Sequence, residues 1–223
     1  MIPWVELDSL PLPRGGVLRL MRRGQEFSIK LGVAELMTSR QFGSEEALAT
    51  LSAAKLAGRK APRVLIGGLG MGFTLRAALQ AFGADAKIVV AELVPQVVGW
   101  ARGPMAELFG ASLDDPRVEL VIADVAGLIR APGRPFDAIL LDVDNGPEGM
   151  TQAVNDDLYS PRGLAAARAA LRPQGVLAVW SQGPDRTFAQ RFAKAGFVVE
   201  DKRVRAGGSH GGTRHVIWLG VRG

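Results

Sequence analysis

The stretch RVLIGGLGMGFTLRAAL, Arg63–Leu79, decides the fold. A short apolar run, VLI, meets four glycines, and a segment rich in alanine and leucine follows them. Glycine permits turns that a Cβ atom would forbid, and it lets a ligand touch the backbone. A strand, a glycine turn and a helix in this order are typical of an open α/β sheet whose ligand lies at the carboxyl ends of the strands.

The pattern continues to the end of the chain as apolar runs that alternate with helical segments. The predicted strands are Val64–Gly67, Lys87–Glu92, Val118–Ala123, Phe136–Asp142, Val176–Ser181, Val198–Arg205 and His215–Val221. The predicted helices are Gly72–Phe82, Pro95–Leu108, Val125–Arg130, Pro161–Leu171 and Arg186–Ala195. Strands that are apolar throughout predict a parallel sheet covered on both faces. Because no helix separates the last two strands, we expect them to pair antiparallel. The fold class is therefore α/β, with a Rossmann-like sheet of seven strands.

Residues 1–60 differ from this pattern, and we expect them to form a small N-terminal region beside a ligand-binding domain at 61–223. Two β-like runs, Val17–Met21 and Glu26–Leu31, flank RRGQ and predict a hairpin. The segment SEEALATLSAAKLAG then predicts a helix.

Ser44 is the expected N-cap of that helix, since its hydroxyl suits the free N–H groups of a first turn. Glu45 and Glu46 would follow in the first turn, where negative charge is favourable.

Composition excludes several classes of site. The chain has 223 residues, 48% of them hydrophobic, and no cysteine, so disulfides and thiolate metal sites are excluded. Only two histidines are present, and we expect no metal site. The net charge is +5, but the arginines are scattered, so we expect no nucleic-acid partner. The N-terminus lacks the features of a signal peptide and no apolar run is long enough for a membrane span, which predicts a cytoplasmic protein that does not bind a membrane.

The glycine motif and the next strand predict a nucleoside site. Gly68, Gly70 and Gly72 give G-x-G-x-G, whereas a dinucleotide motif needs G-x-G-x-x-G and this chain has Phe73 at the last position. Glu92 ends the next strand, about twenty residues on, where an acidic side chain accepts both hydroxyls of a ribose. We infer that the ligand is S-adenosylmethionine or a relative.

The ends of the next two strands supply further candidates. Asp124 is placed to accept from the adenine amine and Val125 to offer its backbone N–H, although Asp124 also suits a helix cap. Asp142 is expected to bind the amino group of the methionine moiety or a substrate amine, and Asp144 follows it in a turn. An Asx turn is the alternative for both. The expected cofactor-binding set is Gly68, Leu69, Gly70, Gly72, Glu92, Leu93, Asp124, Val125 and Asp142.

These segments resemble the spermidine synthase family, within the S-adenosylmethionine methyltransferase superfamily. The likeness rests on VLIGGLGMGFTLR, VVAELVPQVV, DPRVELVIADV, FDAILLDVDNGP and LYSPRGLAAARAALRPQGVLAV. It implies a small N-terminal β domain, a small-molecule acceptor and a homodimer. It also implies that QFGSEEA lies where the N-terminal region covers the substrate.

The chain departs from that family at three places. The family's glycine motif carries an aspartate for aminopropyl transfer, and Met71 stands there in this sequence. The loop after Asp142 is shorter than the family's D-[ST]-[ST]-D-P. The family's tyrosine would fall near Gly163–Leu164, whereas Tyr159, the only tyrosine, lies earlier.

From these departures we expect a methyltransferase that acts on an unidentified small molecule. The expected catalytic residues are Asp142, Asp144 and Tyr159, with Asp144 or Tyr159 as general base. The alternative is polyamine aminopropyl transfer from decarboxylated S-adenosylmethionine, with Asp142 and Asp144 binding and deprotonating the amine. A third class, a nucleic-acid modifier or a non-catalytic nucleoside-binding module, is weakened because DNGP lacks the second proline and the aromatic residue of base-methylating loops. Trp180 is expected in the core, with a place at the acceptor pocket as the alternative.

Overall fold

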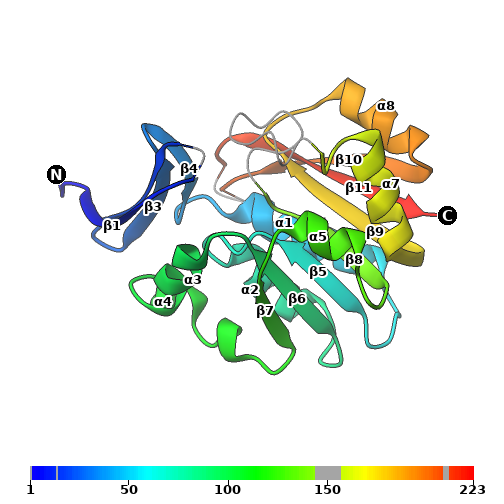
Figure 1. Ribbon diagram of the computed structural model, residues 1–223, viewed down its shortest axis with the longest axis horizontal. Helices are drawn as coiled ribbons and strands as arrows, with labels where there is room; N and C mark the ends of the chain where they lie inside the picture. Colours follow the sequence, from blue (N-terminus) through cyan, green and yellow to red (C-terminus); the bar gives the residue numbers. More distant parts are fainter. Residues whose placement is uncertain (1, 14, 144–156, 208–210) are drawn as a thin grey trace.

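The computed structural model describes residues 2–13, 15–143, 157–207 and 211–223, and its strands form two sheets (Figure 1). The large sheet has the order β10-β11-β9-β8-β5-β6-β7. Its strands are β5 (Arg63–Gly67), β6 (Lys87–Glu92), β7 (Val118–Ile122), β8 (Phe136–Leu141), β9 (Leu171–Ser181), β10 (Phe197–Arg205) and β11 (Arg214–Arg222). β11 runs antiparallel to both of its neighbours, β9 and β10, and the pairs among β5 to β9 are parallel. The predicted seven-stranded α/β sheet is confirmed.

Helices cover both faces of this sheet. They are α1 (Gly43–Lys55), α2 (Phe73–Ala81), α3 (Pro95–Arg102), α4 (Ala106–Phe109), α5 (Val125–Arg130), α7 (Pro161–Ala170) and α8 (Arg186–Lys194), with a 3-10 turn at Ser112–Asp114. Within β5, Ile66 packs with residues of α1, α2 and α3, whereas Leu65 packs with residues of α5, α7 and α8. Successive side chains of a strand point to opposite faces, so a strand covered on both faces must be apolar throughout. No helix in the described ranges is long and apolar enough to cross a membrane.

The single helix predicted over Pro95–Leu108 is wrong. The structure has two helices there, α3 and α4, separated at Gly103 and Pro104. Proline has no N–H for the helical ladder, and it disfavours helical geometry at the residue before it. The apolar periodicity continues across this break, which is why it suggested one helix.

The small sheet is an antiparallel meander of β1 (Val5–Pro11), β2 (Val17–Arg23), β3 (Glu26–Leu31) and β4 (Ala34–Thr38). The β2–β3 hairpin was predicted, but the outer strands were not. Figure 1 shows this sheet beside the large one, near α3. Asp8 of β1 joins the two parts, because its carboxylate accepts from Trp100 Nε1 at 2.7 Å and from the side-chain amide of Gln96, both on α3.

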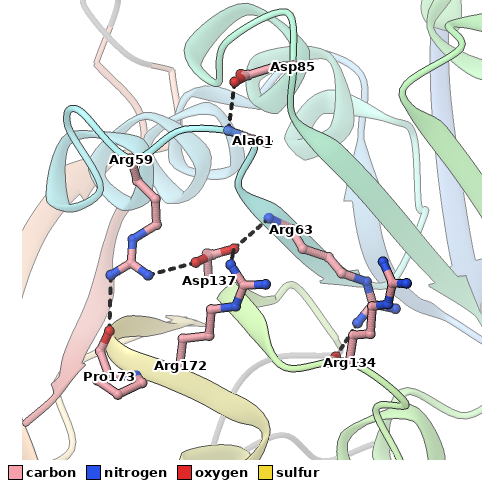
Figure 2. Close-up of polar contacts among 8 residues, drawn as sticks. All are labelled: Arg59, Ala61, Arg63, Asp85, Arg134, Asp137, Arg172 and Pro173. Carbon is pink, nitrogen blue, oxygen red and sulfur yellow. Dashed lines mark hydrogen bonds and ion pairs between the residues drawn. The ribbon is translucent and has the colours of Figure 1, made fainter.

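A buried aspartate closes the amino-terminal edge of the large sheet (Figure 2). The side chain of Asp137, on β8, is 0% exposed. It accepts from Arg59 Nη1 at 2.8 Å and from the backbone N–H of Arg63 at 2.8 Å, and Arg172 Nη1 lies 3.5 Å away. Arg59 also donates to the carbonyl of Pro173 at 3.0 Å. One carboxylate thus links β5, β8, β9 and the segment after α1.

Replacing Asp137 should destabilise the protein strongly. We expect Asp137→Ala to lower the free energy of unfolding by about 3 kcal/mol, because it leaves a buried N–H and two guanidinium groups without their shared acceptor. Urea unfolding measures this change. The matched control is Asp114→Ala at the exposed pair with Arg102 (3.3 Å), which should leave the free energy of unfolding unchanged. An equal loss in both variants would contradict the prediction.

Candidate functional site

The glycine turn after β5 brings two strand ends into close contact. Gly68 has φ +91°, and a Cβ atom there would lie 2.4 Å from the carbonyl oxygen of Asp142. Gly72 precedes α2 with φ +79°, and its Cβ would lie 2.3 Å from a ring carbon of Phe109. Gly68 therefore permits the approach of β5 to the end of β8, whereas Gly72 permits helix packing.

Glu92 lies at the carboxyl end of β6 and is 7% exposed. Its carboxylate accepts from the backbone N–H of Leu69 at 2.9 Å and from that of Val94 at 2.8 Å. Burial raises the pKa of Glu92, while these N–H groups oppose the rise. The carboxylate is therefore held in one orientation by the turn that it faces.

Asp124 caps α5, as the alternative interpretation predicted, because its side chain accepts from the backbone N–H of Ala126 at 2.8 Å. Asp124 and Val125 both line the same cavity as Glu92. A cap and a ligand contact are compatible, since a carboxylate has several acceptor sites. The adenine-binding role stays a prediction.

This first cavity, of about 150 Å³, lies between the two sheets. The large sheet contributes most of the expected cofactor set, namely Gly68, Gly70, Glu92, Leu93, Asp124, Val125 and Asp142. The small sheet and its loops contribute Leu12, Leu18, Ile29, Leu31, Leu36 and Met37. Leu69 and Gly72 are not among the described lining residues. Leu69 acts instead through its bond to Glu92, and Gly72 through packing.

A second cavity, of about 80 Å³, adjoins the first at Leu36, Met37, Gly70 and Asp142. Its other lining residues are Glu45, Met71, Phe73 and Trp180. Trp180 is only half-buried and lines this cavity, so the pocket alternative is the one that the structure favours.

Two partly buried carboxyl groups face this second cavity. Desolvation raises the pKa of Asp142 to about 6, opposed by a hydrogen bond from Thr74 Oγ1 at 2.5 Å. Desolvation, and then the charge of Asp142, raise the pKa of Glu45 to about 7. Near neutral pH the site therefore disfavours two full negative charges.

Sequence reasoning missed Glu45 and misplaced Ser44. The expected N-cap role of Ser44 is wrong: α1 begins at Gly43 after Phe42, and Ser44 lies inside the helix, fully buried. Its hydroxyl donates to Glu45 Oε2 at 2.6 Å and lies 2.9 Å from His215 Nδ1. Adjacent serine and glutamate are ordinary at a helix start, so their pattern carries no signal of a site. Only the family resemblance of QFGSEEA pointed to this segment.

Of the two other expected catalytic residues, the structure describes only Tyr159. Asp144 lies outside the described residues. Tyr159 is 2% exposed and packs edge-on against Phe188, with ring centroids 5.9 Å apart. Among the described residues it lines neither cavity, and its general-base role stays a prediction. In the same ranges no group of three or more histidine, aspartate or glutamate side chains is arranged to hold a metal ion.

The sequence model of the spermine/spermidine synthase domain matches residues 41–190. The chain belongs to the spermine/spermidine synthase domain family. The match covers the glycine turn and both cavities' polar residues, Glu45, Glu92, Asp124 and Asp142.

Curated relatives of this spermine/spermidine synthase domain are named polyamine aminopropyltransferases. One, from Mycobacterium tuberculosis, is 35% identical over 127 residues, and another, from Hyperthermus butylicus, is 33% identical over 135 residues. The matches cover 56% and 59% of this chain but 23% and 44% of those proteins. The chain thus spans less than half the length of these curated relatives.

Solved structures agree with the fold of the domain. Spermidine synthase from Thermotoga maritima superposes with a TM-score of 0.77 at 21% identity, over 98% of this chain and 73% of that chain. A spermidine synthase in complex with the transition-state analogue AdoDATO gives a TM-score of 0.76, also at 21% identity, over 98% and 72% of the two chains. At 21% sequence identity, the structural similarity establishes the fold of this chain and no more.

The expectation of methyl transfer from S-adenosylmethionine to a small molecule is wrong. The family and the names of the curated relatives favour the alternative, aminopropyl transfer. The expectation rested on Met71, which replaces a carboxylate in the glycine motif. It did not take Glu45 into account, which brings a carboxylate to the same cavity from α1.

The raised pKa of Glu45 predicts a pH dependence of stability. The ordinary value is 4.5 and the folded value about 7, so the folded protein keeps a proton that the unfolded chain releases. The contribution of Glu45 to the free energy of unfolding should be greatest below pH 4.5 and fall as the pH rises through 7. We expect Glu45→Gln to lose less stability over this window. Its free energy of unfolding should fall less steeply with pH, by up to about 1.4 kcal/mol per pH unit. Urea unfolding across this pH range checks it, and parallel curves for both proteins would contradict it.

Proposed function

We propose that this chain catalyses aminopropyl transfer from decarboxylated S-adenosylmethionine to an amine. The observation that carries the proposal is the pair Glu45 and Asp142, two carboxyl groups beside a narrow cavity that adjoins a larger one with nucleoside-binding features. Carboxylates bind ammonium groups well, and both substrates of this reaction carry one, since the donor has an ammonium group and so does a polyamine acceptor. The names of the curated relatives support the same reaction.

The first cavity is proposed to hold the nucleoside of the donor. Glu92 would accept from the ribose hydroxyls, and Asp124 with the backbone of Val125 would contact the adenine. The glycine turn at Gly68 and Gly70 leaves the backbone open to the sulfonium end of the donor. This arrangement orients the donor so that its aminopropyl chain extends toward the second cavity.

The reaction needs one bond made, one broken and one proton removed. The nitrogen of the acceptor attacks the methylene carbon attached to the sulfonium, the carbon–sulfur bond breaks, and its electron pair stays on sulfur in methylthioadenosine. Asp142 lines both cavities, where it can accept the proton that the attacking nitrogen must lose. The remaining contribution of the protein is to align the two substrates.

The family resemblance also implies a homodimer through the small sheet, and we propose this assembly. Val5 of β1 and Val33 beside β4 are exposed, at 54% and 102% of their reference areas.

Calorimetric titration with decarboxylated and with intact S-adenosylmethionine tests the function. We expect the decarboxylated form to bind more tightly, by about tenfold or more, because the additional carboxylate of the intact form would meet Glu45 and Asp142. Steady formation of methylthioadenosine with a diamine acceptor would support the reaction. Tighter binding of intact S-adenosylmethionine would contradict it.

The placement of the nucleoside is tested by Glu92→Gln. We expect about a tenfold loss of affinity for methylthioadenosine, since one ribose contact loses its charge. Glu119→Gln is the matched control, because Glu119 is an exposed carboxylate on the neighbouring strand β7 and should leave affinity unchanged. Unchanged binding by both variants would place the nucleoside elsewhere.

A further inference from the structure

The carboxyl groups of the second cavity come from elements far apart in the sequence. Glu45 lies in the first turn of α1, and Asp142 follows β8. The described residues place no lysine or arginine in ion-pair contact with either group, and the charge that acts on Glu45 most strongly is that of Asp142. Among the described residues that line the cavity, two carboxyl groups are therefore present and no lysine or arginine is.

Hydrogen bonds hold both carboxyl groups in place. The buried hydroxyl of Ser44 donates to Glu45 Oε2 at 2.6 Å, and His215 Nδ1 lies 2.9 Å from the same hydroxyl. Thr74 Oγ1 donates to Asp142 Oδ2 at 2.5 Å. The stacked rings of Phe42 and Phe73, 4.7 Å apart, fix the start of α1 against the start of α2. A site that is positioned in this way does not depend on a ligand to assemble it.

The other walls define the shape of the ligand. Met37, Met71, Phe73 and Trp180 line a space of about 80 Å³. A methylene chain fits apolar walls, and aromatic side chains favour a nearby cation. A primary ammonium group has three N–H donors, enough to contact both carboxylates. A divalent metal ion would need more oxygen ligands than these two side chains provide.

We propose that Glu45, together with Asp142, binds the primary alkylammonium group of a substrate and selects for it. The glycine motif contributes Met71 to the wall of this cavity and no carboxylate. Glu45 supplies the second carboxylate from α1 instead. This inference rests on the proposed function. The ammonium belongs either to the aminopropyl chain of the donor or to the acceptor amine, and both have the same chemistry at this cavity.

The test compares Glu45→Gln with Glu46→Gln by calorimetry. Glu46 is the next residue of α1 and is not among the described residues that line the cavity, so it is a matched control. In the first arm each protein is titrated with decarboxylated S-adenosylmethionine and with methylthioadenosine, which lacks the aminopropyl ammonium. In the second arm 1,4-diaminobutane is titrated into protein saturated with methylthioadenosine.

We expect Glu45→Gln to weaken binding about tenfold or more in one arm, with methylthioadenosine affinity and Glu46→Gln unchanged. Loss in the first arm assigns the ammonium to the donor, and loss in the second arm assigns it to the acceptor. Unchanged affinity in both arms overturns the inference while leaving the proposed function intact. If the parent protein binds neither methylthioadenosine nor the decarboxylated donor, the proposed function fails, and the inference fails with it. Equal loss of methylthioadenosine binding in Glu45→Gln would indicate a structural role and would also overturn it.

Discussion

Two backbone hydrogen bonds beyond the ends of the central strands hold the site together. The N–H of Gly68 donates to the carbonyl of Ala91 at 2.9 Å, and the N–H of Asp142 donates to the carbonyl of Gly67 at 3.0 Å. They extend the parallel ladders of β5 with β6 and β8 by one step, past the last residues of the strands. Glu92 and Asp142 consequently end on either side of the glycine turn. A side chain at Gly68 would separate them, because its Cβ would meet the backbone of Asp142.

The parallel strands β5 to β9 were predictable because most of their residues are apolar and a helix follows each of them. Burial on both faces produces that pattern, and the alternation of Leu65 and Ile66 between two core clusters is its structural counterpart. The outer strands of the small sheet were missed for the opposite reason. β1 has the sequence VELDSLP and is mostly exposed, so burial does not impose a regular alternation of apolar and polar residues on it.

The candidate site was predictable where it lies at strand ends. Glu92, Asp124 and Asp142 each end or follow a strand, and parallel strands bring such residues to one edge. Glu45 comes from a helix that precedes the whole parallel sheet, and only the packing of α1 against α2 and the sheet brings it to the cavity. The function was misjudged for the same reason. The loss of a carboxylate at one sequence position, Met71, says little about the charge of a cavity that several elements build.

The first cavity is divided between two sheets of different chemical character. The described residues that the small sheet and its loops contribute are all apolar, from Leu12 to Met37, whereas the carboxylates come from the large sheet. Shape and chemistry are therefore encoded in separate parts of the sequence. Substitutions in the first forty or so residues can reshape the substrate space while the reacting groups stay in place. Proteins with this architecture can thus diverge in substrate range through changes in the small sheet and its loops alone.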